Sequence, residues 1–212
     1  RMPETLAPEH RAPFCLRRIV DSTLEIVRSR QAIGYTLAAG LLGGAFLGYL
    51  NSAQQIFQEQ SALGERFPLV FAVIALSMGL ATMLNSRLVM RFGMRFLVRW
   101  SLTIVVGLAL LALGPALLTA GHPPLSLFVA YVMTTFFFIG IVWGNQNSLV
   151  MEPLGHLAGI GAAIVGSLST LMSMPLGALV GQRYDGTVLP LIVGMAVLSG
   201  LSLLFVRWAE SA

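Results

Sequence analysis

Four amide side chains share one face of the first long apolar segment, provided that this segment is a helix. They follow one another at i, i+3, i+4 and i+7: Asn51, Gln54, Gln55 and Gln58. An amide is costly to place against lipid, so these groups must face protein or a water-filled cavity. There they can donate and accept hydrogen bonds without carrying charge. The stripe is therefore either the wall of a ligand path or a set of hydrogen bonds between helices.

Small residues extend this face toward the start of the same segment. Gly40, Gly44 and Gly48 recur every four residues. Such spacing lets another backbone or a bulky ligand approach closely, and close helix packing is its more common use. We expect packing for these glycines.

A second polar cluster ends a later apolar segment. Trp143 and Asn147 lie one helical turn apart, on the face that also carries Phe136 and Gly140. An aromatic ring beside an amide suits a flat, amphipathic ligand. Tryptophan is also a common anchor at the membrane interface, and asparagine is common at helix ends, so a purely structural role is the alternative.

Small residues form a third pattern, spaced by three or four along the fifth apolar segment. They are Gly159, Ala163, Gly166, Thr170, Ser173, Gly177 and Gly181. Pro175 lies among them and removes one backbone hydrogen bond. The pattern predicts a helix that packs closely and bends, as an alternating-access protein requires, although a rigid bundle also uses such helices.

Arginines repeat every four residues in the segment 85–95, which we expect to be a loop around one glycine turn. Its notable residues are Asn85, Arg87, Arg91, Gly93 and Arg95. Guanidinium groups at this spacing can hold helix C-terminal carbonyls, carboxylates of a neighbouring helix or lipid phosphates. Anchoring of the membrane topology is the simpler alternative.

These patterns belong to an integral membrane protein. Of the 212 residues, 56% are hydrophobic and 10% charged, and the mean hydropathy is +0.81, which excludes a soluble enzyme. Six segments have spanning length. They run from about 33–57, 67–84, 96–120, 125–150, 157–181 and 188–207. We expect an all-α bundle of six transmembrane helices over 32–208, after a linker at 1–31 with an amphipathic helix and before a tail at 209–212.

Charge distribution sets the expected orientation. Eleven of the thirteen arginines fall on the side shared by both termini, while Arg66 and Arg183 lie on the other side. The positive-inside rule then predicts a multi-pass protein of the cell (inner) membrane with both termini in the cytoplasm. The sequence pI near 10.0 favours anionic lipid headgroups over nucleic acid as the partner.

Several kinds of chemistry lack the residues that they require. Cys15 is the single cysteine, and the three histidines are scattered, so we expect no metal site and no cofactor. The middle of each predicted span lacks carboxylates, histidines and lysines, the groups that proton relays inside membranes use. Ser167 and Ser169 have no buried histidine to activate them. We therefore expect a protein that is not an enzyme.

Four stretches together resemble the second half of a major facilitator superfamily transporter of the Bcr/CflA-type drug-resistance group. They are residues 2–11 (MPETLAPEHR), 85–95, 158–166 (AGIGAAIVG) and 184–190 (YDGTVLP). The resemblance covers essentially the whole chain, which would correspond to the last six of twelve helices.

The resemblance implies a secondary transporter that exports small amphipathic, drug-like molecules in exchange for protons by alternating access, and so contributes to antibiotic resistance. Substrate would lie between two six-helix halves, so the chain needs an N-terminal half or a second copy, and that half would carry the proton-coupling acid. Arg87, Arg91, Gly93 and Arg95 match the family's cytoplasmic gating loop, whereas Asn85 replaces the aspartate of its best-known form.

The fifth apolar segment also carries a family-like motif, and two other functions fit the same fold. Pro175, Gly177 and Gly181 are similar to the bend motif of antiporters. A metabolite carrier of the same fold is one alternative, and a six-helix assembly partner that transports nothing is another. The amide stripe favours transport, because an inert bundle has little need of it.

Overall fold

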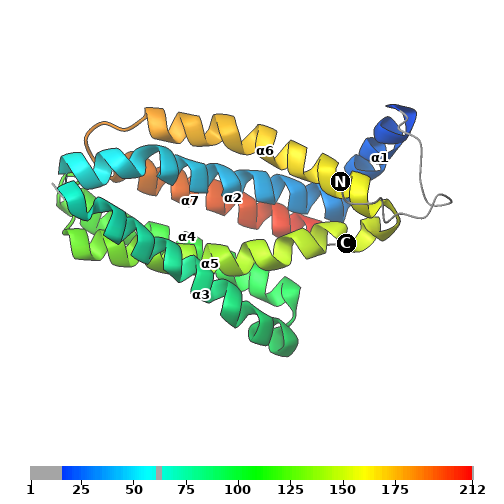
Figure 1. Ribbon diagram of the computed structural model, residues 1–212, viewed down its shortest axis with the longest axis horizontal. Coiled ribbons are helices and arrows are strands. Elements are labelled where there is room, and N and C mark those ends of the chain that lie inside the picture. Colours follow the sequence, from blue (N-terminus) through cyan, green and yellow to red (C-terminus); the bar gives the residue numbers. More distant parts are fainter. Residues whose placement is uncertain (1–15, 61–63, 212) are drawn as a thin grey trace, which may run out of the picture.

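The computed structural model describes residues 16–60 and 64–211, and the elements in these ranges are helices (Figure 1). The long ones are α1 (Leu16–Arg28), α2 (Arg30–Gln55), α3 (Phe67–Phe92), α4 (Met94–Leu118), α5 (Leu125–Met151), α6 (Ala158–Gln182) and α7 (Leu189–Glu210). Short turns of helix lie at η2 (Ile56–Gln60), η3 (Gly64–Arg66) and η4 (Glu152–Leu157).

Six helices within the described ranges are long and apolar enough to cross a membrane, as the sequence predicted. Their apolar stretches are Arg30–Glu59, Gly64–Phe92, Met94–Leu118, Leu125–Gly155, Gly159–Gln182 and Leu189–Glu210. The protein is therefore an all-α, multi-pass membrane protein whose six helices fit one half of a major facilitator fold.

The prediction of a loop at 85–95 is wrong, because nearly all of these residues are helical. α3 continues to Phe92, α4 begins at Met94, and Gly93 alone separates them with φ 77°. Arginine, leucine and methionine are good helix formers, and nothing before Gly93 breaks the pattern. A left-handed glycine then ends α3, with its N–H donating to Val89 O at 2.9 Å.

Local signals explain other helix boundaries. Ser29 caps α2 by accepting a hydrogen bond from the Ala32 N–H at 3.3 Å, so this helix begins at Arg30 rather than near residue 33. Proline occupies the first turn of both α3 and α7, where the missing N–H is not needed. Pro115 and Pro175 instead lie inside α4 and α6.

α2 runs through the middle of the bundle, and α6 and α7 pack along it (Figure 1). α5 packs against both α3 and α4, and α4 also packs against α7. α6 makes most of its contacts with α2 alone and lies at the upper edge of the view. α2 is thus the helix with the largest buried share, whereas α3 and α6 leave most of their surface uncovered.

Aromatic side chains pack within a largely aliphatic core, and the outer surface is apolar. Tyr49 meets Phe136 edge to face, with 4.7 Å between the ring centroids. Large aliphatic side chains point outward, as Leu111 at 74% and Leu118 at 89% exposure illustrate. Water would not tolerate such a surface, but lipid does.

Close packing of α2 and α6 depends on glycines from both helices. A Cβ on Gly44 would lie 2.8 Å from Leu176, and one on Gly48 would lie 2.7 Å from Val180. In the opposite sense, Gly177 makes room for Leu47, and a Cβ on Gly181 would lie 2.6 Å from Asn51. The two backbones therefore approach closely along this seam.

The amphipathic helix predicted in the linker forms as α1, beside the N-terminal end of α2. Ser22 and Ile26 are buried against the bundle, whereas Val20, Leu24 and Val27 are about half exposed. The rest of the predicted linker, residues 1–15, lies outside the described residues.

Candidate functional site

A cavity of about 500 Å³ opens between α2, α5 and α6. Its lining comprises Ala39, Gly43, Phe46, Leu47, Trp143, Gln146, Asn147, Val165, Gly166, Ser169, Thr170 and Ser173. The volume is in the range of small-molecule sites, and the lining combines an apolar wall with a few amides and hydroxyls.

Two residues predicted to contact substrate, Trp143 and Asn147, both line this cavity. Phe46 of α2 meets the Trp143 ring edge to face, with 4.9 Å between centroids and 72° between planes. Phe136 lies behind Phe46, with 5.4 Å between their centroids. The cavity therefore has a rigid aromatic wall on which a flat apolar ligand can rest.

Gln146 is the most deeply buried polar residue among those described in the cavity lining. Its side chain is 1% exposed, and its Nε2 donates to the backbone oxygen of Tyr35 at 3.0 Å. Because that carbonyl can only accept, the amide orientation is fixed, and Oε1 faces away from it. Oε1 is buried and has no hydrogen-bonding partner in the described chain. An acceptor in this condition is expensive unless a ligand or another state of the protein satisfies it.

The sequence analysis selected Trp143 and Asn147 and did not select Gln146, which lies between them in the chain. The available signal was its position three residues after Trp143, which puts it on the same side of α5. What distinguishes it from Asn147 is the carbonyl of Tyr35, and that group comes from a helix more than a hundred residues away.

The four-amide stripe lies beyond the cavity lining. Asn51, Gln54, Gln55 and Gln58 are all exposed, and none forms a hydrogen bond with another described residue. Leu47 lines the cavity, and Asn51 and Gln54 follow it at i+4 and i+7, so the stripe continues the α2 wall toward one end. The described bundle therefore supplies no partners for these amides.

The small residues of α6 have two kinds of surroundings, because some line the cavity and others pack against α2. Gly166 and Thr170 line the cavity, and a Cβ on Gly166 would meet nothing within 4 Å. Ser173 donates to the backbone oxygens of Gly40 at 2.9 Å and of Ser169 at 2.7 Å. Pro175 follows, and Gly177 and Gly181 then pack against α2. Ser173, Gly177 and Gly181 therefore contact α2, whereas Gly166 and Thr170 border open space.

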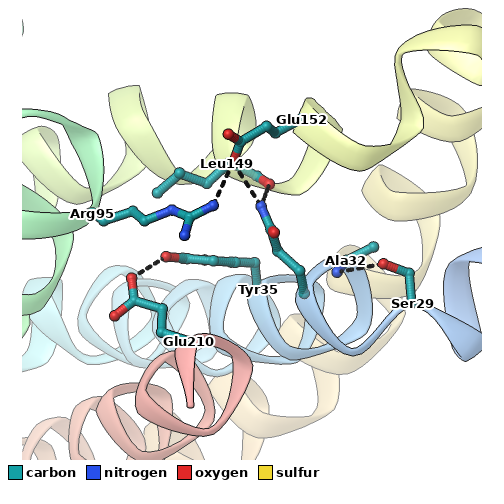
Figure 2. Close-up of polar contacts among 8 residues, drawn as sticks. Ser29, Ala32, Tyr35, Arg95, Leu149, Glu152 and Glu210 are labelled. Atoms are coloured by element: carbon teal, nitrogen blue, oxygen red, sulfur yellow. Dashed lines mark hydrogen bonds and ion pairs between the residues drawn. The ribbon is translucent and has the colours of Figure 1, made fainter. Parts of the chain in front are cut away.

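The end of the bundle that carries Arg95 and Arg99 holds two polar clusters, and Figure 2 shows the first of them and the Tyr35–Glu210 contact of the second. In the first, Glu152 of η4 accepts from Arg95 Nη2 at 3.0 Å and from Gln31 Nε2 at 2.8 Å. In the second, Glu210 of α7 accepts from the Tyr35 hydroxyl at 2.5 Å and pairs with Arg99 Nε at 3.5 Å. Together they join α2, α4, α7 and the end of α5.

The remaining residues of the predicted gating loop fall into two groups. Asn85 lies on α3, and its Oδ1 accepts a hydrogen bond from Asn145 Nδ2 of α5 at 2.6 Å. Gly144 leaves the room for this contact, because a Cβ there would lie 3.0 Å from Asn85 Nδ2. Arg87 and Arg91 are exposed. The structure therefore brings Asn85 and Arg95 into contact with the α5 side but leaves Arg87 and Arg91 outside.

The sequence analysis did not select the residues that complete these polar contacts, which are Gln31, Tyr35, Asn145, Glu152 and Glu210. A carboxylate next to an arginine-rich end was the one available signal for Glu152 and Glu210. Within the described residues, no group of three histidines, cysteines or carboxylates could hold a metal ion.

At the opposite end, a short polar turn joins α6 to α7. Asp185 accepts from the Thr187 N–H at 3.0 Å and from the Thr187 hydroxyl at 2.7 Å, which lowers the pKa of Asp185. Gly121 of the α4–α5 turn lies beside Thr187, and its oxygen accepts from the Val188 N–H at 3.1 Å. The α4–α5 and α6–α7 turns are therefore in direct contact at this end.

Two curated proteins resemble the chain. It is 30% identical over 192 residues to the uncharacterized MFS-type transporter YdgK of Bacillus subtilis (strain 168), covering 90% of this chain and 47% of that protein. It is 25% identical over 207 residues to the bicyclomycin resistance protein homolog of Haemophilus influenzae, covering 96% of this chain and 50% of that protein.

The chain thus spans about half the length of the curated relatives that it matches. No family model and no solved structure matches it. The Bacillus subtilis relative is named as a transporter. With six membrane-spanning helices and these relatives, the chain resembles the C-terminal half of a major facilitator superfamily transporter of the Bcr/CflA group.

Proposed function

We propose that this chain is one half of a secondary transporter and that the cavity between α2, α5 and α6 binds its substrate. The observation that carries the proposal is this cavity of about 500 Å³, which has an aromatic wall and an unpartnered buried acceptor in a membrane protein.

The lining defines the chemistry of the ligand. Trp143 and Phe46 favour a flat apolar surface, and Gln146 Oε1, which lies beneath the cavity surface, would accept a hydrogen bond from an N–H or O–H donor of a ligand that reaches it. None of the described residues that line the cavity is charged, so a formal charge on the ligand is not required by this half. Small amphipathic molecules satisfy these conditions, and Asn51, Gln54, Gln55 and Gln58 would line the rest of their path.

Export of drug-like molecules in exchange for protons is the finer part of the proposal. Its support is the name of the Haemophilus influenzae relative, a bicyclomycin resistance protein homolog, together with the sequence resemblance. The predicted spans lack a carboxylate or histidine at mid-depth. Proton coupling therefore needs an acid from an N-terminal half or from a second copy of the chain.

The arginine-rich end would act as the cytoplasmic gate. Arg95 with Glu152, and Arg99 with Glu210, hold four parts of the bundle together at this end. Asn85 adds a neutral contact to α5, where an aspartate would add charge. Opening the gate would require these contacts to rearrange, while Pro175, Gly177 and Gly181 would let α6 bend.

The direct test is to express the chain alone and together with a six-helix N-terminal half, and to reconstitute each in vesicles. Proflavine uptake under an imposed pH gradient is followed by fluorescence, and lumenal pH is followed in parallel. We expect dye flux and dye-dependent proton movement with the partner half present, and neither with the chain alone.

Three results would count against the proposal. Proton movement driven by the chain alone would contradict the need for a second half. Flux of small metabolites without dye flux would favour a metabolite carrier of the same fold. A stable complex of both halves that moves no tested compound would favour an assembly partner.

A further inference from the structure

A second hollow, separate from the substrate cavity, lies on the outer surface of α4 and α7. Its volume is about 360 Å³. It is lined by Arg95, Phe96, Arg99, Trp100, Thr103 and Arg207. Arg95, Arg99 and Thr103 follow at i, i+4 and i+8 along the start of α4, while Arg207 comes from the last turn of α7.

The charges of this hollow are only partly compensated. Arg95 pairs with Glu152 through Nη2, and Arg99 pairs with Glu210 through Nε, so each guanidinium keeps further N–H donors. Arg207 is exposed and forms no ion pair with any described residue. None of the described residues that line the hollow is a carboxylate. Three positive groups with two negative partners leave one positive charge and several free donors.

Aromatic residues mark the boundary between this hollow and an apolar surface. Phe96 and Trp100 are 45% and 54% exposed, and their ring centroids are 5.7 Å apart. Leu110 and Leu111 follow Arg99 and Trp100 by eleven residues, which is three turns along the same faces of α4. Leu110, Leu111 and Leu204 are 58%, 74% and 60% exposed. The hollow therefore adjoins a surface suited to acyl chains, and tryptophan typically marks the headgroup level.

We propose that this hollow binds the phosphate of an anionic phospholipid headgroup whose acyl chains lie along α4 and α7. Guanidinium groups bind phosphate through paired, charge-assisted hydrogen bonds, and three arginines from two helices can surround one such group. The uncompensated charge favours phosphatidylglycerol or cardiolipin over a zwitterionic lipid. A bound phosphate would tie the start of α4 to the end of α7. This inference does not rest on the transport proposal.

The test measures lipid retention by the full chain. The chain is placed in nanodiscs with equal amounts of phosphatidylcholine and phosphatidylglycerol, released into detergent and weighed by native mass spectrometry. We expect selective retention of phosphatidylglycerol. Arg207→Gln should weaken it about fivefold, the effect of one arginine near a charged surface. Arg207→Lys should keep most of it.

Arg28→Gln is the matched control, since Arg28 is an exposed arginine of α1 outside the hollow. Equal loss in Arg28→Gln and Arg207→Gln would show a general charge effect and overturn the proposal. So would equal retention of both lipids. If millimolar inorganic phosphate displaced phosphatidylglycerol, the hollow would be a site for soluble anions, and the lipid proposal would be overturned.

A second measurement needs no change of arginine, which protects the test against a variant that does not fold. With Trp143 and Trp208 replaced by phenylalanine, the fluorescence comes from Trp100 at the edge of the hollow. Phosphatidylglycerol with brominated acyl chains should quench it more strongly than brominated phosphatidylcholine at equal content. Equal quenching by both lipids would contradict the proposal.

Discussion

At the scale of single residues, the hydrogen bonding of Gln146 is set by tertiary contacts that its sequence position does not reveal. A glutamine at the end of an apolar helix is unremarkable in sequence, but here one half of the amide is fixed by Tyr35 O and the other half is unpartnered. The same side chain lines the cavity beside Trp143. Its expected effect is therefore on the choice of ligand rather than on folding alone.

The prediction for Gln146 uses two dyes with the same ring system. Proflavine carries amino N–H donors, and acridine orange carries methyl groups in their place. Gln146→Met should lower the apparent affinity for proflavine by roughly 2- to 13-fold, because one hydrogen bond is lost, and leave that for acridine orange nearly unchanged. Dye binding is measured by fluorescence titration of the chain paired with its N-terminal half.

Gln182→Met is the control for this experiment, because Gln182 is an exposed amide on α6 outside the cavity lining. Equal losses for both dyes in Gln146→Met would assign Gln146 to packing. No loss for either dye would remove it from the binding site, while leaving the cavity itself as a candidate.

At the scale of elements, the contact between α2 and α6 determines how far the two backbones can separate. Glycines on both helices receive side chains from the other one. The cavity lies beside this seam, because Gly43 and Leu47 of α2 and Ser169 and Ser173 of α6 line it together with residues of α5. The same stripe of small residues on α6 therefore supports close packing in one part and open space in the other.

The prediction for this seam compares two glycines of one helix. Gly177→Ala should destabilise the protein by about 1–3 kcal/mol, because the added Cβ collides with Leu47 and approaches the α2 backbone. Gly159→Ala should be neutral or slightly stabilising, since nothing lies within 4 Å and alanine favours helix. Thermal unfolding in detergent, followed by size-exclusion chromatography, measures both. Equal stability of the two variants would contradict the close approach.

At the scale of the whole molecule, polar contacts gather at one end of the bundle. Arg30 lies over the Trp208 ring at 5.0 Å and donates to Ser211, which brings the start of α2 beside the end of α7. The ion pairs of Arg95 and Arg99 lie at the same end. The opposite end is held by the contact between Gly121 and Thr187. Which side of the membrane each end faces stays a prediction from the arginine distribution.

The orientation prediction is that the arginine-rich end faces the cytoplasm. In a background lacking Cys15, Ser86→Cys and His122→Cys place one exposed thiol at each end of the bundle. An impermeant maleimide should label His122→Cys in intact cells and Ser86→Cys only after permeabilisation, as the positive-inside rule requires. Labelling in the reverse pattern would overturn both the orientation and the cytoplasmic gate.

Much of the architecture could be read from sequence, because lipid imposes a simple rule. Each spanning segment must satisfy its backbone internally, so long apolar runs become helices, and the six segments were found close to their observed positions. Helix ends were less predictable. The segment 85–95 contains arginines and an asparagine but no helix breaker before Gly93, and polarity alone does not end a helix.

The sequence by itself determined the membrane environment, the six spans and the residue types available for ligand contact. Tertiary structure decided which of those residues meet. Trp143, Asn147 and Gln146 share a cavity with α6, whereas the four amides of α2 continue beyond it. Glu152 and Glu210 acquire their partners Arg95 and Arg99 only through the packing of α4 against α5 and α7. Spacing along one helix fixes a face, but the neighbour of that face depends on contacts between distant segments.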